Sequence, residues 1–282
     1  MEARLLDDAD AFLAEAGALL LEDEARHNLI LGIAGTIRAD PGLYPEQRFW
    51  VVTDGAETVA AALRTPPHQL VLARPRDESA LAVLVDGIDD ELPGVGGAVP
   101  EVEAFARDWA RRHGITSRVV RSMGVYALER VQPVPRAPGA SRPASREDEP
   151  LLLHWMRAFA DEVLNESDPD RDHPEPMIEH RLASADAGFV VWEDDGEPVS
   201  FAGWGGPTPN GIRVGPVYTP PELRGRGYAT TLVAELSTTL LEGGRSFCFL
   251  FTHLANPTSN AIYERIGYVR VCESTQIAFE LR

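Results

Sequence analysis

A glycine-rich turn between a predicted strand and a predicted helix offers the clearest chemistry in this sequence. The turn reads Arg224-Gly-Arg-Gly227 and lies directly before an apolar pattern of helical period over residues 229–242. Glycines let backbone N–H groups approach a ligand closely, and the first N–H groups of a helix have no acceptor within the helix. The turn therefore predicts a phosphate-binding site made of backbone and of the positive end of a helix.

Three other interpretations of this chemistry do not fit. The turn has no Gly-Lys-Ser/Thr ending, which excludes the loop that binds nucleoside triphosphates. The dinucleotide fingerprint fails because Tyr228, Ala229 and Thr230 follow Gly227 without a third spaced glycine. Serine hydrolase chemistry is excluded because no Gly-x-Ser-x-Gly elbow occurs.

The turn resembles the acetyl-coenzyme A loop of the GNAT acetyltransferase superfamily, whose pattern Arg/Gln-x-x-Gly-x-Gly/Ala is met by Arg224, Gly227 and Ala229. The strand over residues 215–219 is similar to the family's central strand, which splays from its neighbour. Residues 246–252 read as the next strand, almost wholly apolar and therefore buried on both faces. Residues 256–268 are similar to the second family signature, a short helix with Asn near its start, Tyr in its middle and Gly-Tyr after it.

The resemblance implies a task for each candidate residue. Backbone N–H groups of the loop would receive the pyrophosphate of acetyl-coenzyme A, and Arg224 and Arg226 would add positive charge. Asn260 would hold the arm of the cofactor, and Tyr263 would protonate the leaving thiolate, a nearly balanced transfer between groups with ordinary pKa values of about 10 and 8.5. The implied catalytic residue is Tyr263, and the implied cofactor-binding residues are Val217, Tyr218, Thr219, Arg224, Gly225, Arg226, Gly227, Tyr228, Ala229, Thr230, Asn256 and Asn260.

Some of these residues also have a purely structural interpretation. Tyr263 would fit as a helix residue that packs under the sheet, and Asn256 would fit as the cap of that helix. A base must also take a proton from the attacking amine, because a primary amine with a pKa of about 10.4 is charged at neutral pH. Glu222, His253 and Tyr218 are all candidates for this base, and the sequence does not choose among them.

The length of 282 residues predicts two domains, at 1–132 and 137–282, joined by a linker with four prolines over residues 131–143. The first half repeats the second in degraded form: helices through residue 37, a hairpin at 48–64, strands at 69–73 and 80–85, a glycine turn from 92 that enters a helix ending near 110, and strands at 117–121 and 124–131. Residues 273–281 form the last predicted strand. The fold class is α/β (α+β), with two tandem GNAT-like modules, each a mixed, largely antiparallel sheet flanked by helices.

Charge and composition bound the partners. The net charge of −18 argues against nucleic acid and an anionic membrane, and it favours a cationic acceptor, although acidity is also an ordinary means to solubility. The absence of a long apolar run or a signal pattern predicts a cytoplasmic protein. Cys248 and Cys272 are expected to be core residues of a reduced protein. Residues 168–172 with Glu179 imitate a calcium loop, but His173 replaces its glycine, so we expect no metal.

The sequence thus predicts an N-acetyltransferase that transfers an acetyl group from acetyl-coenzyme A to a primary amine by direct attack, with its active site in the C-terminal module. The acceptor would be a small-molecule amine or a protein or peptide amine, and a homodimer is allowed. One alternative is a non-catalytic acyl-coenzyme A sensor or partner subunit. Another keeps the fold but transfers a longer acyl group or an aminoacyl group.

Overall fold

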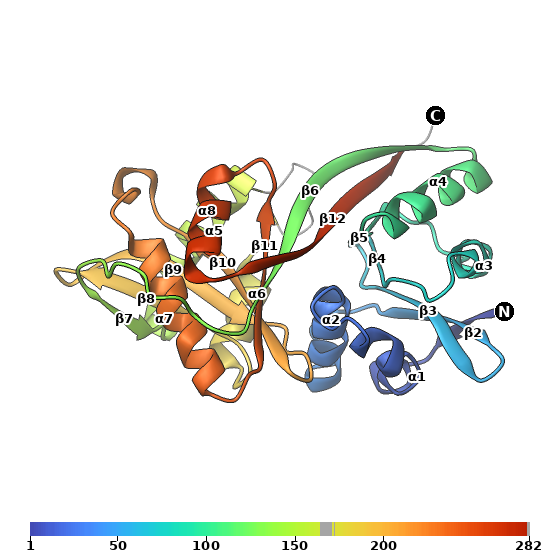
Figure 1. Cartoon of the computed structure of the whole chain (residues 1–282), viewed down its shortest axis with the longest axis horizontal. Helices are drawn as coiled ribbons and strands as arrows, with labels where there is room; N and C mark the ends of the chain where they lie inside the picture. Colours follow the sequence, from blue (N-terminus) through green and yellow to red (C-terminus); the bar gives the residue numbers. More distant parts are fainter. Residues whose placement is uncertain (164–170, 172, 281–282) are drawn as a thin grey trace. The chain divides into compact units, whose positions relative to one another are not determined.

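The structure is a computed structural model that describes residues 1–163, 171 and 173–280. The described chain groups into two compact units, whose elements are labelled in Figure 1. The first unit comprises residues 1–125, 253–255 and 271–280, and the second comprises the described parts of 126–252 and 256–270. The first unit therefore contains both the first 125 residues and the last described strand residues, 271–280.

A mixed sheet forms the centre of the first unit, in the strand order β1-β2-β3-β4-β5-β12. The β4–β5 pair is parallel, and the other neighbours in this order are antiparallel. The elements that precede the linker are β1 (Glu2–Leu6), α1 (Ala9–Leu21), α2 (Asn28–Ala39), β2 (Arg48–Asp54), β3 (Glu57–Arg64), β4 (Leu70–Leu72), α3 (Ser79–Gly87), β5 (Gly94–Ala98), α4 (Glu101–His113) and β6 (Thr116–Leu128).

Strand β2 shows how the sheet of the first unit acquires helices on both faces. Successive side chains of a strand point to opposite faces, so an apolar run in β2 supplies two cores. Phe49 and Val51 pack with residues of α1 and α2, whereas Trp50 and Val52 pack with residues of α3 and α4. The run of four apolar residues at 49–52 in β2 is thus the signature of a strand buried on both sides.

The second unit has a sheet in the order β11-β10-β9-β8-β7. Its β10–β11 pair is parallel, and the other pairs are antiparallel. Its elements are β7 (Ala140–Pro143), the 3₁₀ helix η1 (Arg146–Asp148), α5 (Glu149–Val163), α6 (Glu175–Ala183), β8 (Gly188–Asp194), β9 (Glu197–Gly205), β10 (Gly211–Tyr218), η2 (Pro221–Leu223), α7 (Tyr228–Glu242), β11 (Phe247–His253) and α8 (Pro257–Ile266), after which β12 (Val269–Glu280) ends the described chain.

Helices cover both faces of this second sheet as well. Phe189 and Val191 of β8 pack with α5 and α6, while Trp192 packs with residues of α7 and α8. The two units repeat one order of elements, namely a strand, two helices, a hairpin, a strand, a helix, a strand and a helix. This repeat confirms the predicted fold class, with two modules that each have a mixed, largely antiparallel sheet.

The last strand of the chain belongs to the sheet of the first unit. Five residues of β12 pair with β5, from Ser274 opposite Ala98 to Ala278 opposite Gly94, and Ile277 enters the core of that unit. A Cβ atom on Gly94 would lie 2.4 Å from the carbonyl oxygen of Ile277, so this approach needs glycine. The division of the chain therefore differs from the predicted one, which gave residues 271–280 to the second domain.

Four predicted elements of the first half are corrected by the structure. Residues 80–85 lie in helix α3, and the glycine-rich residues 94–98 form strand β5 where a turn was predicted. The first residues form strand β1, although the prediction began with a helix. The two strands predicted at 117–121 and 124–131 are one continuous strand, β6.

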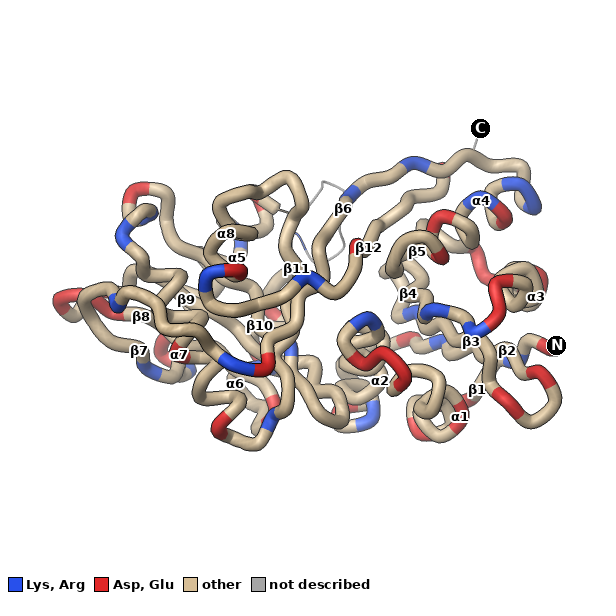
Figure 2. The backbone as a smooth tube through the Cα atoms, in the orientation of Figure 1, with Lys and Arg blue, Asp and Glu red and all other residues tan. Residues whose placement is uncertain are grey.

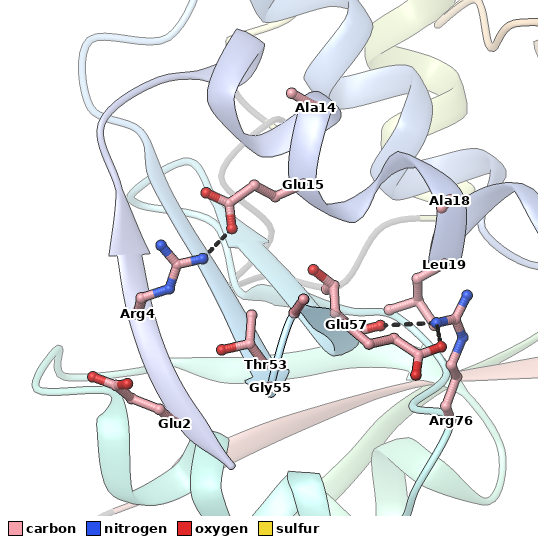
Figure 3. A pocket seen from close by; sticks show the side chains of 12 residues that line it. Glu2, Arg4, Ala14, Glu15, Ala18, Leu19, Thr53, Gly55, Glu57 and Arg76 are labelled. Carbon is pink, nitrogen blue, oxygen red and sulfur yellow. Dashed lines mark hydrogen bonds and ion pairs between the residues drawn. The ribbon is translucent and has the colours of Figure 1, made fainter.

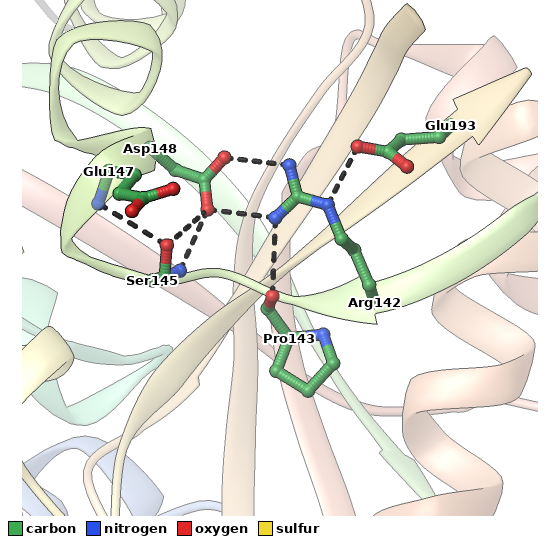
Figure 4. A network of polar contacts seen from close by, with 6 residues as sticks. All are labelled: Arg142, Pro143, Ser145, Glu147, Asp148 and Glu193. Atoms are coloured by element: carbon green, nitrogen blue, oxygen red, sulfur yellow. Dashed lines mark hydrogen bonds and ion pairs between the residues drawn. The ribbon is translucent and has the colours of Figure 1, made fainter. Parts of the chain in front are cut away.

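A polar network holds the start of α5 in the second unit (Figure 4). The Ser145 hydroxyl accepts the N–H of Glu147, and Asp148 accepts the N–H of Ser145, and these two bonds form a capping box. Arg142 of β7 donates to both oxygens of Asp148 at 2.7 and 2.8 Å and to Glu193 of β8. The Arg142 guanidinium lowers the pKa of Asp148 to about 2.

The chain contains no lysine, so its 26 Lys and Arg positions are all arginines. Figure 2 shows these arginines interspersed with the more numerous acidic residues in both units. None of the described helices is long and apolar enough to cross a membrane.

Candidate functional site

Strands β10 and β11 of the second unit separate soon after they begin. Their pairing runs over three positions, from Gly211 opposite Phe247 to Arg213 opposite Phe249. Beyond Arg213, β10 follows its other neighbour, β9, and shifts register against it between Val214 and Val217. Within the described pairing, the β11-facing edge of residues 214–218 has no strand partner, so its N–H and C=O groups are available to an extended ligand.

An arginine from α6 supports the bulge at which β10 turns. Gly215 has a φ of +138°, and its carbonyl oxygen accepts a hydrogen bond from Nη1 of Arg181 at 2.7 Å. The Arg181 guanidinium also lies 5.3 Å from the ring centre of Phe189. Arg181 was not predicted from the sequence, and a single arginine in a helix carries no signal that would have identified it.

The predicted phosphate-binding turn, residues 224–227, lies at the start of α7, as the sequence required. We call this turn and the first N–H groups of α7 the cradle. Gly225 and Gly227 have φ values of +80° and +88°, in the left-handed region that favours glycine. Thr231 makes the first helical bond, to the carbonyl oxygen of Gly227, so the N–H groups of residues 228–230 have no acceptor in the helix. Among the described residues, no side chain caps this end, and a Cβ atom on Gly225 would meet nothing within 4 Å. The geometry suits an anion.

Arg224, the first residue of the loop pattern, has a protein partner in this structure. Its Nη2 lies 2.7 and 2.8 Å from the two carboxylate oxygens of Glu162 at the end of α5, and its Nε donates to the carbonyl oxygen of Thr219. The guanidinium also lies 5.7 Å from the ring centre of Tyr218. The side chain is therefore turned toward α5, whereas the sequence led us to expect it at the cradle.

Tyr228, next to the cradle, has its side chain committed to the fold. The residue is buried, and its hydroxyl donates to Oδ2 of Asp194 at 2.5 Å. This bond to the carboxylate raises the pKa of Tyr228, and the Arg226 guanidinium acts in the opposite direction. Only the backbone N–H of Tyr228 remains for a ligand at the cradle.

The end of β10 is held by a relay of hydroxyl groups. Ser200 is fully buried, donates to the carbonyl oxygen of Tyr218 at 2.9 Å, and lies 2.8 Å from the hydroxyl of Thr219. Since Ser200 uses its one proton on Tyr218, Thr219 is the donor of the second bond. The Tyr218 ring packs near Trp155 of α5, and burial raises the pKa of Tyr218.

Helix α8 brings the two asparagines and Tyr263 of the second signature together. Asn256 is the cap of α8, since its Oδ1 accepts the N–H of Ser259 at 3.1 Å. Asn260 accepts a hydrogen bond from the Thr252 hydroxyl at the end of β11. Asn256 thus caps the helix, as its structural interpretation from the sequence predicted.

Tyr263 lies in the middle of α8 with its ring edge-on to Tyr268, at 6.0 Å between ring centres. Within the described part of the chain its hydroxyl has no hydrogen-bond partner, whereas the Tyr268 hydroxyl is paired with Ser237 at 2.9 Å. Burial raises the pKa of Tyr263 to about 12. The phenol therefore stays protonated at neutral pH and can donate a hydrogen bond.

The three candidate bases have different surroundings. Glu222 is exposed on η2, and its charge acts on Tyr218, as does that of Glu162. His253 uses its Nδ1 to accept the N–H of Ala255 at 3.2 Å, so only Nε2 remains for a proton-transfer role. Arg224 thus contacts Glu162 and Tyr218, and Glu162, Glu222 and Arg224 all act electrostatically on Tyr218.

The cysteines and the acidic segment take no part in this arrangement. Cys248 is buried, and burial raises the pKa of its thiol to about 12, which suits a small core residue. In the part of the chain that the structure describes, no three His, Cys, Asp or Glu side chains gather in a way that could hold a metal ion. Residues 168–170 and 172 of the calcium-like segment lie outside the described residues.

In the first unit, the corresponding loop comprises residues 73–78 between β4 and α3. A side chain of this loop accepts the N–H group at the start of the helix. Asp77 accepts hydrogen bonds from both the N–H and the hydroxyl of Ser79, at 2.8 and 2.7 Å, and thus occupies the start of α3. A Cβ atom on Gly97 of β5 would lie 3.1 Å from the carbonyl oxygen of Leu72 of β4, so these strands stay close.

An open depression of about 620 Å³ in the same unit lies beside this loop (Figure 3). It is lined by β1, α1 and the β2–β3 hairpin. Its arginines are engaged within the fold: Arg4 is paired with Glu15, and Arg76 with Glu57 and Glu22.

Comparison with known proteins finds one family profile and several structures of similar fold. Residues 152–268 match the family profile described as "Acetyltransferase (GNAT) family". A structure of a Drosophila protein covers 99% of this chain and 98% of its own at 15% identity, with a TM-score of 0.68. A GCN5-related N-acetyltransferase from Kribbella flavida covers 88% and 95% at 20% identity, with a TM-score of 0.57.

A tandem GNAT protein from the clavulanic acid biosynthesis pathway covers 99% of this chain and 98% of its own at 13% identity, again with a TM-score of 0.57. No protein of curated function matches the sequence. The residues that match the family profile run from within α5 to just past the end of α8. The second unit therefore carries the match to the GNAT acetyltransferase family, and the whole chain shares its fold with a tandem GNAT protein.

Proposed function

We propose that the second unit binds acetyl-coenzyme A and transfers its acetyl group to a primary amine. One observation carries the proposal: α7 begins uncapped by any described side chain, behind two left-handed glycines, and follows the strand that separates from β11. A coenzyme A thioester has a pyrophosphate that suits the helix end and an extended amide-bearing arm that suits an unpaired strand edge. A lone phosphate or nucleotide would use only the first of these features.

Different residues of the second unit would bind the different parts of acetyl-coenzyme A. The N–H groups of residues 228–230 would receive the pyrophosphate, and the edge of residues 214–218 would bond the arm. Bound acetyl-coenzyme A would supply a thioester carbonyl that a neutral amine can attack directly. Tyr263, whose hydroxyl has no other partner among the described residues, would face the sulfur and donate a hydrogen bond to it.

The raised pKa of Tyr263 changes how this donation would work. A phenol with a pKa of about 12 is a weaker acid than the leaving thiol, whose pKa is about 8.5. The difference of roughly 3.5 pKa units corresponds to about 5 kcal/mol. Full proton transfer is therefore uphill, in contrast to the near balance expected from ordinary pKa values. Tyr263 would stabilise the developing thiolate as a hydrogen-bond donor, which a partly buried phenol does without losing its proton.

The same pKa is the observation that favours a second candidate. A protein that only binds acyl-coenzyme A, as a sensor or partner subunit, needs no acid beside the sulfur, and a weakly acidic tyrosine would then serve packing alone. Turnover of acetyl-coenzyme A with any member of a panel of primary amines, including small amines and peptides, separates the two candidates.

Calorimetric titration of the full chain with acetyl-coenzyme A tests the proposal. We expect one site per chain, because the equivalent helix of the first unit is closed by Asp77. Two sites would contradict the assignment to the second unit, and no binding would refute the proposed function.

The variant Gly227→Asp sharpens this titration. A carboxylate at position 227 would accept the free N–H groups itself, as an ordinary helix cap does, so the fold should survive while the binding of acetyl-coenzyme A is lost. Gly244→Asp is the matched control, because Gly244 has a φ of +100° and open space at the other end of α7. Equal loss of binding in both variants would show that the effect is strain rather than occupation of the cradle.

We place this reaction in the cytoplasm, where the free thiols of Cys248 and Cys272 would remain reduced. The acceptor would be a small-molecule amine or the amine of a peptide or protein. Since the chain has no lysine, acetylated product in an assay cannot be confused with acetylation of the protein's own lysine side chains.

A further inference from the structure

The ion pair between Arg224 and Glu162 stands beside the proposed cofactor site and is not explained by it. Nη2 of Arg224 lies 2.7 and 2.8 Å from the two oxygens of Glu162, and the side chains are 46% and 42% exposed. A pair this exposed contributes only about 0.2–1 kcal/mol. Breaking this ion pair therefore costs little free energy, and the stability of the fold alone does not explain it.

Arg224 also directly precedes Gly225, the first left-handed residue of the cradle. An arginine fork binds a phosphate as well as a carboxylate, and often bidentately. A bound coenzyme A would place a pyrophosphate carrying two negative charges at the cradle, against the single charge of Glu162. The Arg224 guanidinium thus has two competing anionic partners, one from the protein and one from the ligand.

We propose that Arg224 exchanges Glu162 for the pyrophosphate when coenzyme A binds, and that the released Glu162 then binds a cationic group of the acceptor. The inference rests on the proposed function, since it needs coenzyme A at the cradle. Two consequences follow for the two ligands, and they have opposite signs. Glu162 weakens the binding of the cofactor and strengthens the binding of the acceptor.

The surroundings of Glu162 support the second half of this exchange. The charges of Glu162 and Glu222 both raise the pKa of Tyr218, and the charge of Arg224, which is paired with Glu162, lowers it. Once Arg224 turns away, Glu162 and Glu222 leave an excess of negative charge on the outer side of Tyr218. A carboxylate that binds an ammonium group keeps it protonated, which would slow its attack. Glu162 therefore suits a second cationic group of the acceptor, as in a diamine, better than the reacting nitrogen.

Titration of the unmodified chain and its variants with coenzyme A tests the first half. We expect Glu162→Gln to bind coenzyme A about two- to five-fold more tightly than the unmodified chain, since it no longer competes for Arg224. Arg224→Gln should bind more weakly, and the double variant should show no gain over Arg224→Gln alone. Glu222→Gln is the control for a general charge effect, because no bond joins Glu222 to Arg224 in the structure; any gain from it should persist in the Arg224→Gln background.

Titration of the coenzyme A-saturated protein with a linear diamine tests the second half. We expect the diamine to bind at least severalfold more tightly than it binds the free protein, and more tightly than a monoamine of the same chain length. Both differences should disappear in Glu162→Gln and remain in Glu222→Gln. A diamine affinity that ignores coenzyme A, or one that survives Glu162→Gln, overturns the proposed role of Glu162 in acceptor binding.

The two proposals fail in different ways. If the unmodified chain does not bind coenzyme A, the proposed function is refuted. If it binds coenzyme A but Glu162→Gln leaves the affinity unchanged or weaker, the site stands and the exchange of partners is overturned. Because both side chains are about half exposed, none of these substitutions removes a buried contact, and all variants should fold.

Discussion

At the start of α3 a carboxylate accepts a backbone N–H group, whereas at the start of α7 no described side chain does so. In the first unit, Asp77 accepts the N–H and the hydroxyl of Ser79, so the helix end satisfies itself. In the second unit, the equivalent position is reached through Gly225 and Gly227, and no described side chain caps the helix. Two modules of one fold therefore differ in whether the helix end is left to a ligand.

Sequence patterns identified the backbone part of this site but not its side-chain partners. Glycines before a helical repeat define the cradle locally, since both features lie within one short segment. The bond from Arg224 to Glu162 joins residues 62 positions apart, and the bond from Tyr228 to Asp194 joins residues 34 positions apart. No local pattern specifies such contacts, because they depend on how helices and hairpins pack.

Replacing Tyr263 by phenylalanine removes a hydroxyl that has no partner among the described residues, and it leaves the ring unchanged. We expect the affinity for acetyl-coenzyme A to stay within about two-fold and turnover to fall about 10- to 100-fold, as for the loss of a hydrogen bond to a charged group. Calorimetry and steady-state kinetics measure the two quantities separately. Tyr268→Phe is the control, since that hydroxyl is already bonded to Ser237. Unchanged turnover would assign Tyr263 to packing.

The elements of the second unit followed more directly from the sequence than those of the first. The predicted helix at 229–242 became α7 and the predicted strand at 246–252 became β11, because apolar period and flanking glycines agreed. Residues 80–85 were misread because a short apolar run fits a buried strand and a buried helix alike. Asp77, which lies two residues before the first residue of α3 and accepts the N–H of Ser79, was the local signal for the helix.

The network at the start of α5 predicts a pH-dependent stability. The pKa of Asp148 is about 2 in the folded protein against an ordinary value of 3.8, so its contribution is present above about pH 4 and is lost as the pH falls from about 4 to 2. Asp148→Asn should lower the free energy of unfolding by about 2 kcal/mol at neutral pH, and by less at pH 3. Urea denaturation across this range measures the difference.

Glu147→Gln serves as the control for this prediction, because the exposed Glu147 contributes its backbone N–H to the capping box and not its carboxylate. A difference between Asp148→Asn and the unmodified chain that stays constant down to pH 3 would show that the carboxylate charge is not what stabilises α5.

His27 makes a second pH-dependent contact, between the end of α1 and the loop after β4. Its Nδ1 lies 2.9 Å from the carbonyl oxygen of Leu20, and its Nε2 accepts the N–H of Arg74, so the buried ring is neutral. Burial lowers the pKa of His27. Its contribution is therefore complete above the unfolded value of about 6.5 and declines as the pH falls below it.

Hydrogen–deuterium exchange in α2 measures this effect locally. Protection should decrease between pH 7 and pH 5, after correction for the intrinsic exchange rate. His27→Gln should remove this pH dependence, whereas His154→Gln, at an exposed position of α5, should retain it. A decrease that persists in His27→Gln would place the titrating group elsewhere.

At the scale of the whole molecule, the two units are not two consecutive pieces of chain. The first unit includes Ile277 of β12 in its core, and the second includes Tyr126 and Leu128 of β6 in its own. The sequence could not show this, because the glycines of β5 were read as a turn and their partner strand lies near the other end of the chain. The repeat of elements was predictable, but the assignment of the closing strand was not.

A cut in the linker tests this arrangement. We expect residues 1–136 alone to remain unfolded or to aggregate, because β5 would expose an unpaired edge and the core would lack Ile277. A peptide of residues 269–280 should restore the fold, as measured by circular dichroism, and the same peptide with Ile277→Asp should not. A stable, soluble fragment without any peptide would contradict the role of β12.

The pairing of β12 with β5 also bears on how the protein is made. A ribosome completes Ala98 of β5 long before it reaches Ile277, 179 residues later by the numbering, and at about 5–20 residues per second this takes roughly 10 to 40 s. For that time the first half of the nascent chain has a strand edge and no partner for it. The first module to be synthesised is thus the last that can be completed, and a chaperone that covers the open edge of β5 during synthesis would raise the yield of folded protein.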